Sequence, residues 1–283
     1  MKNRYVQVAP ETFHSWLIPV ATVLYCLAAL CGAAGVAYLV MPGSVGILVE
    51  DLMAGGITEA SAIRTWKLIH VVITMIAFAW PAVLSVGYVQ TLRRQPGRGL
   101  IMLCGVFEWL VKILKALKTV LIVIFIYRVI RYAVLVLPKN EGMYYLYAMF
   151  VSEALMLIIA GTLYVLLQRF LNCICDSAAS IADTLENARL SSCSIPGFAA
   201  TGFLVFGLIG LFFGLDRIFT MIIVEEYRSS HYAFLTAAHP LLILSGAAMV
   251  LGALGNLFSG IYLFAFKRKS EKLYHRFRQN LMQ

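Results

Sequence analysis

Apolar residues along the chain fall into long runs that shorter polar segments separate. A helix rises about 1.5 Å per residue, so roughly 20 apolar residues cross a hydrocarbon core about 30 Å thick. Helices are expected in these runs because lipid offers backbone N–H and C=O groups no partner outside the segment. Membrane spans are predicted at residues 16–41, 68–92, 119–137, 143–170, 198–224 and 240–266. The pattern therefore predicts an all-α, polytopic transmembrane helix bundle of about six spans that forms one integral membrane domain, 1–283.

Residues 100–118 have a different pattern. Glu108, Lys112 and Lys115 recur at helical spacing, and apolar residues occupy the other faces. This arrangement is typical of an amphipathic helix at a membrane surface. We expect it to lie on the cytoplasmic side and lead into the third span. The alternative places it inside the bundle, with the charged stripe facing a polar cavity.

Two further segments are predicted to lie outside the membrane. Residues 171–196 form a cytoplasmic loop in which apolar residues at near-helical spacing predict a short amphipathic helix packed under the bundle. Pro196 and Gly197 then break the chain before the fifth span. Residues 267–283 form a basic cytoplasmic tail.

The composition agrees with a membrane protein. The 283 residues are 61% hydrophobic and 13% charged. Soluble domains are typically about 45–50% apolar and about 25% charged. The chain departs from both values in the direction that a bilayer requires.

Lysine and arginine are distributed unequally between the two sets of predicted loops. On one side they occur in the N-terminal segment, the loop after the second span, the loop after the fourth span and the C-terminal tail. The opposite loops carry fewer cations and more carboxylates. The positive-inside rule then predicts a multi-pass protein of the cell membrane with both termini in the cytoplasm. Because the cations behind the net charge of +9 flank apolar spans, anionic lipids rather than nucleic acid are the expected partner.

Arg128 and Glu153 are charges inside predicted spans, where charge is costly unless it is paired or hydrated. They flank the predicted turn at 138–142 at similar distances, so two antiparallel helices would bring them to similar depth. An Arg128–Glu153 ion pair is therefore predicted. It either fixes the register of the two helices or forms a site for an anionic group or a proton-coupled switch.

A second polar group lies towards the outer ends of the spans. His70, Asp216, Arg217 and His239 could line an outward-facing vestibule, or they could be polar residues at ordinary interfacial positions. Histidine and carboxylates also suit metal ions, but no paired spacing such as H-E-x-x-H is present, so no metal site is predicted.

Small residues recur on two spans. Gly210 and Gly214 form a G-x-x-x-G step, and Gly252, Asn256 and Gly260 continue a stripe four residues apart. Such faces let helix backbones approach closely. We expect contact between these two antiparallel helices, with a homo-oligomer interface as the alternative. Asn256 should find a hydrogen-bond partner across the contact.

No P-loop, nucleophile elbow or dinucleotide-binding fingerprint is present, so no catalytic residue and no cofactor are predicted. The leading hypothesis is a non-enzymatic membrane protein, either permease-like or a component of a membrane assembly. An intramembrane enzyme or a sensor with a polar site near the outer face is the alternative.

Overall fold

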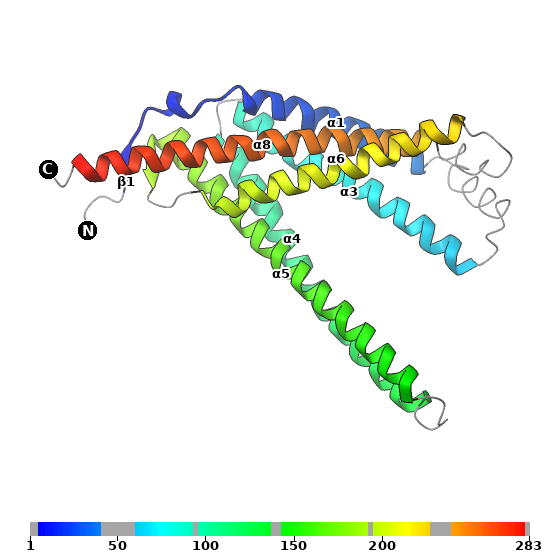
Figure 1. Cartoon of the computed structure of the whole chain (residues 1–283). Coiled ribbons are helices and arrows are strands. Elements are labelled where there is room, and N and C mark those ends of the chain that lie inside the picture. The colour runs from blue at the N-terminus through cyan, green and yellow to red at the C-terminus, as the bar shows by residue number, and fades with distance from the viewer. Residues whose placement is uncertain are drawn as a thin grey trace. The chain divides into compact units, whose positions relative to one another are not determined.

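The computed structural model describes residues 5–40, 60–92, 96–136, 143–191, 195–226 and 239–280. Within these residues the fold is helical apart from one pair of short strands (Figure 1). The helices are α1 (Leu17–Val40), α3 (Ala60–Leu92), α4 (Pro96–Val136), α5 (Met143–Asn187), α6 (Gly197–Glu226) and α8 (His239–Asn280). A 3-10 turn, Pro10–Phe13, precedes α1, and the strands are β1 (Tyr5–Gln7) and β2 (Arg189–Ser191).

Five helical segments in the described residues are long and apolar enough to cross a membrane. They are Leu17–Val40, His70–Leu92, Leu157–Asn187, Gly197–Phe219 and Pro240–Phe277. The predicted span 119–137 is not among them, and it extends beyond the described residues at its C-terminal end. The predicted all-α membrane fold is confirmed, with five to six spans, and the chain is an integral membrane protein.

The chain divides into two compact units. The first, here called the bundle, comprises residues 1–103 and 177–283. The second, here called the helix pair, comprises residues 104–176 and contains α4 from residue 104 to its end and α5 from its start to residue 176. Each unit has its own pattern of packing.

Small residues hold the helices of the bundle close together. α8 packs on α6 and on α1, and α3 lies against α1 and α8 (Figure 1). A Cβ atom added at Gly214 would stand 3.0 Å from the backbone nitrogen of Val250 and 3.1 Å from the carbonyl oxygen of Gly246. Backbone atoms cannot turn aside as a side chain can, so a larger residue at this position would push α6 away from α8.

The stripe of small residues on α8 serves two contacts, whereas one was expected. Gly210 and Gly260 lie at the α6–α8 contact together with Gly214. Gly252 instead faces α3 and α1, and Asn256 bonds to those same two helices. The reason is geometric: each four-residue step advances about 40° around a helix with 3.6 residues per turn, so a long stripe turns away from a single neighbour.

Segments that are distant in sequence meet at one end of the bundle. β1 pairs with β2 in an antiparallel register, with Val6 opposite Leu190. Three further bonds join this end: Val8 N to Ala188 O at 3.0 Å, Lys269 Nζ to Thr12 O at 3.1 Å, and Gly97 N to Glu186 Oε1. The N-terminal segment, the start of α4, the end of α5 and the extension of α8 are therefore packed together.

Three helices run past the predicted ends of their spans without a break. α4 begins at Pro96, a residue favoured in the first turn of a helix, and it joins the predicted helix 100–118 to the third span. α5 continues through most of the predicted loop 171–196, and α8 continues into the predicted tail. No proline follows Pro96 in α4 or occurs within α5, so neither helix contains the residue that most often ends one.

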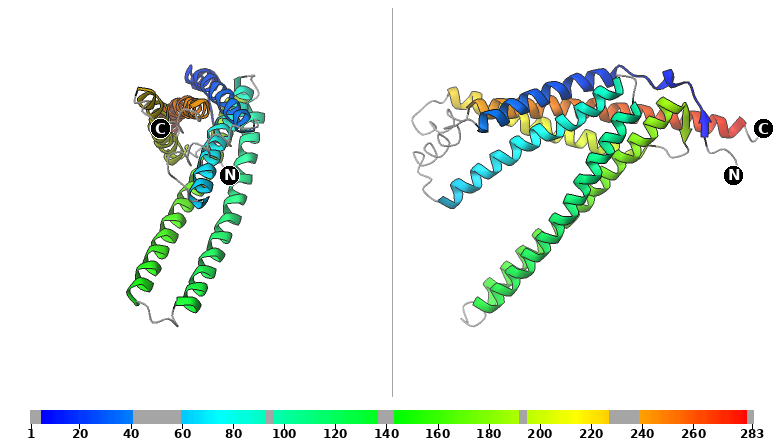
Figure 2. Two further views of the ribbon diagram at one scale, coloured as in Figure 1. Left: turned by 90° about the vertical axis from the view of Figure 1, so that its right-hand side faces the viewer. Right: turned by 180° about the vertical axis from the view of Figure 1, so that it is seen from behind.

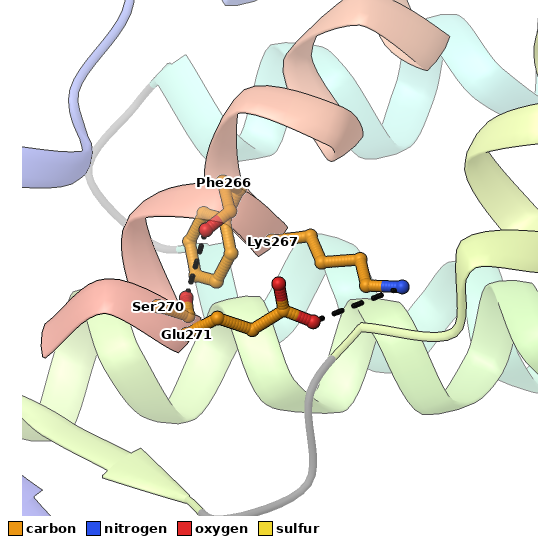
Figure 3. Close-up of polar contacts among 4 residues, drawn as sticks. All are labelled: Phe266, Lys267, Ser270 and Glu271. Atoms are coloured by element: carbon orange, nitrogen blue, oxygen red, sulfur yellow. Dashed lines mark hydrogen bonds and ion pairs between the residues drawn. The ribbon is translucent and has the colours of Figure 1, made fainter. Parts of the chain in front are cut away.

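The extension of α8 is held by local polar contacts. Ser270 Oγ donates to the carbonyl oxygen of Phe266 at 2.9 Å, and Lys267 Nζ lies 3.8 Å from Glu271 Oε1 (Figure 3). The ring of Phe266 also packs on Phe13, with 4.6 Å between the ring centroids. A solvent-exposed ion pair contributes little, so this aromatic contact is the firmer anchor of the extension.

The helix pair is packed much more sparsely. α4 and α5 run beside each other through this unit (Figure 2). None of the described side chains between residues 112 and 169 is buried. Close polar contact is found where Cys104 Sγ lies 3.6 Å from the carbonyl oxygen of Cys175 and where Lys118 Nζ lies 5.4 Å from the centroid of the Tyr164 ring.

Candidate functional site

Arg217 of α6 lies between residues of two other helices. Its Nη1 donates to Ser245 Oγ of α8, and its Nη2 lies 2.8 Å from His70 Nδ1 of α3. Arginine has only donors, so His70 Nδ1 must act as the acceptor and the imidazole must be the neutral form that is protonated at Nε2. The side chains of His70 and Arg217 are half-buried and Ser245 is fully buried. Three helices of the bundle thus fix one guanidinium group.

A backbone bond orients the hydroxyl group of Ser245. Its Oγ donates to the carbonyl oxygen of Leu242 at 3.3 Å, which leaves its lone pairs available to accept from Arg217. One of the two partners of the guanidinium group therefore has a fixed direction.

The predicted outer vestibule is only partly brought together in the described residues. His70 and Arg217 are in contact, but the side chain of Asp216 is exposed. His239 is the first residue of α8, and its side chain lies outside the described residues. The role of the group stays a prediction. Ser245 was not predicted as part of the site. The signal in the sequence was its depth, because antiparallel packing of the fifth and sixth spans would place it near Arg217.

A second polar cluster lies inside the bundle and was missed from the sequence. Asn256 Oδ1 of α8 accepts bonds from Tyr25 Oη of α1 at 2.8 Å and from Trp80 Nε1 of α3 at 3.1 Å. Ser259 Oγ accepts from Tyr88 Oη at 2.6 Å. The partners of Asn256 come from α1 and α3, whereas the sequence suggested α6.

The donors in this cluster can be placed in order. Tyr25 donates to Asn256, so the 3.1 Å contact between Tyr25 Oη and Ser259 Oγ is donated by Ser259. Tyr88 in turn donates to Ser259. Each hydroxyl thus has a defined direction, which is how a buried polar cluster becomes stabilising rather than costly.

One hydroxyl near this cluster is different. In the described part of the chain, Tyr262 Oη is a buried side-chain oxygen without a hydrogen-bond partner. Asn256, Ser259 and Tyr262 follow one another at intervals of three residues along α8, which places them on neighbouring parts of one face. That spacing, together with the tyrosines inside apolar runs, was the signal in the sequence from which this polar cluster could have been predicted.

Arg128 and Glu153 both lie in helices of the helix pair, on α4 and α5. Arg128 is exposed, and the side chain of Glu153 is outside the described residues. The ion pair between them remains a prediction. Within the described residues, no group of three or more histidine, cysteine, aspartate or glutamate side chains could hold a metal ion.

Comparison with known proteins returned no family model, no curated protein and no solved structure that matches this chain.

Proposed function

We propose that this integral membrane protein is a non-enzymatic component of a membrane assembly. The bundle serves as its structural core, and the helix pair offers the surface on which another membrane protein or a second copy of this chain packs. The observation that carries the proposal is the contrast in burial: no described side chain between residues 112 and 169 is buried. An assembly component needs such an uncovered apolar surface.

The interior of the bundle also favours this function over transport. Tyr25, Phe13 and Leu241 are fully buried, and side chains or backbone of the facing helix stand close to Gly207, Gly214 and Gly260. A close-packed core of this kind supports a scaffold, because a permease needs a central path for its solute.

Blue-native electrophoresis of the protein extracted from its own membranes in mild detergent tests the proposal. The wild-type protein should migrate as a particle larger than one 31.4 kDa chain with its bound detergent. The variant Leu155→Ala/Ile159→Ala/Leu163→Ala removes three exposed side chains from one face of α5 and should release the smaller species. The matched variant Val205→Ala/Leu208→Ala/Phe212→Ala changes an exposed face of α6 and should leave the particle intact. Equal behaviour of the two variants would refute the proposal.

A permease-like protein for an anionic solute is the second candidate, and the Arg217 contact favours it. A guanidinium group inside a membrane span often marks a substrate path. A wild-type particle of monomer size in the same electrophoresis would favour this candidate over the assembly.

The proposed orientation has both termini on the cytoplasmic face of the cell membrane. The contacts among residues 8, 12, 97, 186, 188 and 269 support it, since they unite the segments that carry most of the lysine and arginine. The exposed cations Arg268, Lys269 and Lys272 would then meet anionic lipid head groups. Green fluorescent protein fused to either terminus should fluoresce, whereas alkaline phosphatase fused there should be inactive. Active phosphatase at one terminus alone would contradict the orientation.

A further inference from the structure

We propose that Arg217, held between His70 and Ser245, binds an anionic phosphate group at the membrane boundary opposite the chain termini. The site lies within the bundle, and the inference does not depend on the assembly function.

Unused donors on the guanidinium group are the first observation. Arginine carries five N–H donors. One is given to Ser245 and one to His70. In the described residues, the remaining donors of Arg217 have no hydrogen-bond acceptor. A planar group with several adjacent free donors matches the oxygens of phosphate, which arginine binds through two parallel bonds.

The neutral character of its hydrogen-bond partners is the second observation. Both side chains that bond to the guanidinium group, Ser245 and neutral His70, lack a negative charge. The carboxylate of Asp216, the preceding residue, attracts Arg217, but its side chain is exposed and makes no ion pair with the guanidinium group in the described residues. A half-buried cation whose bonded partners are neutral is stabilised further when an anion binds, because their attraction is stronger away from bulk water.

The position of the site along the helices indicates its depth in the membrane. Arg217 lies about 20 residues along α6 from Gly197, which is roughly 30 Å at 1.5 Å per residue. His70 and Ser245 lie about 22 residues from Leu92 and Lys267, or roughly 33 Å on α3 and α8. Gly197 and Lys267 are close to each other, since an added Cβ at Gly197 would be 3.0 Å from Lys267 Nζ.

Arg217, His70 and Ser245 therefore lie about one hydrocarbon thickness from the cationic end of the bundle. This is the level of the lipid phosphates in the opposite leaflet. Two sources could supply the phosphate group, namely a phospholipid head group and a soluble phosphate ion. The chemistry of recognition is the same for both.

Native mass spectrometry of the full-length protein in detergent tests the lipid source. The probes are dioleoyl phosphatidylglycerol and, for comparison, dioleoyl phosphatidylcholine. Arg217→Gln should weaken phosphatidylglycerol binding about tenfold or more, since it removes at least one charge-assisted hydrogen bond worth about a factor of ten. Arg276→Gln, an exposed change near the end of α8 at a residue not assigned to lipid contact, is the matched control and should change the dissociation constant less than twofold.

Thermal unfolding with added inorganic phosphate tests the soluble source. If phosphate raises the melting temperature of the wild type but not of Arg217→Gln, the ligand is a soluble phosphate. If only phosphatidylglycerol discriminates between these proteins, the ligand is a lipid head group. Either result supports the site.

Arg217→Lys is a second variant for the case in which Arg217→Gln does not fold, because it keeps the positive charge and removes only the planar guanidinium group. Its affinity for the preferred probe should fall about threefold, between those of the wild type and Arg217→Gln. The proposal is overturned if Arg217→Lys binds phosphatidylglycerol and inorganic phosphate as the wild type does. It is also overturned if Arg217→Gln and Arg276→Gln bind both of these ligands equally well.

Discussion

The bundle and the helix pair are both built from long helices rich in apolar residues, yet they use their apolar surfaces in opposite ways. In the bundle, glycines bring backbones together and hydroxyl, indole and amide groups bond across the contacts. In the helix pair, Gly105 and Gly161 meet nothing within 4 Å of an added Cβ, and the described side chains between 112 and 169 are uncovered.

The difference teaches that hydrophobicity alone does not join helices in a membrane. Lipid tails are as apolar as leucine, so association depends on close packing and on hydrogen bonds between helices. The described residues of the bundle show both close packing and interhelical hydrogen bonds, whereas those of the helix pair show little of either. Matched substitutions in the two units should therefore differ in their effect on stability.

The largest effect is expected from one pair of glycine substitutions. Gly214→Leu places a side chain against backbone atoms of α8, so it should lower the free energy of unfolding by about 3 kcal/mol. Gly161→Leu enters open space and should change it by less than about 1 kcal/mol, in the stabilising direction, because leucine favours helix more than glycine does. Thermal melts of both variants in the same detergent give the comparison, and similar losses in the two would show that the helix pair is packed as tightly as the bundle.

Asn256→Leu should have the next largest effect. The buried Tyr25 Oη and the half-buried Trp80 Nε1 would lose Asn256 Oδ1 as their acceptor, at a cost of about 2 kcal/mol. The melting temperature should fall below that of wild type by a clear margin. Trp80→Phe removes one donor together with its bond, so its melting temperature should fall between those of the wild type and Asn256→Leu. An Asn256→Leu protein as stable as the wild type would show that these hydrogen bonds do not stabilise the bundle.

The smallest effect separates two tyrosines of the same bundle. Tyr25→Phe removes a hydroxyl that bonds to both Asn256 and Ser259, so it should cost about 1 kcal/mol. Tyr262→Phe removes a buried hydroxyl that has no partner in the described residues, so it should be neutral or slightly stabilising. Denaturant titration resolves the two, and a greater loss in Tyr262→Phe would mean that this hydroxyl has a partner of its own.

The sequence was sufficient to predict the helices of the bundle and the all-α membrane fold. An apolar run of span length can only satisfy its backbone as a helix, so this inference needed no tertiary information. The helix predicted at residues 100–118 was expected to lead into the third span, and the two form one unbroken helix, α4. A change from an amphipathic to a fully apolar pattern marks a change of surroundings, and it does not require a change of backbone.

The polar sites were harder to predict than the helices. Asn256 was expected to need a partner, but its rotation about α8 decides which neighbour it faces, and that angle depends on how all four helices pack. The strands β1 and β2 were missed for a similar reason, since residues 5–7 and 189–191 make a pair only after the bundle has brought them together. His70 and Arg217 could be placed at similar depth, whereas their contact required the structure.

The contrast between the two units is tested by labelling the purified protein with a phospholipid that carries a diazirine in its acyl chain. The protein is reconstituted at no more than one chain per liposome, so that no second copy covers the helix pair. Light-induced adducts mark side chains that touch lipid, and peptide mass spectrometry assigns them to residues without any substitution. Leu163 of the helix pair is 61% exposed and Leu84 of the bundle is 2% exposed, so adducts are expected at Leu163 and absent at Leu84. Equal labelling of the two leucines, or labelling of Leu84 alone, would contradict a packed bundle joined to an uncovered helix pair.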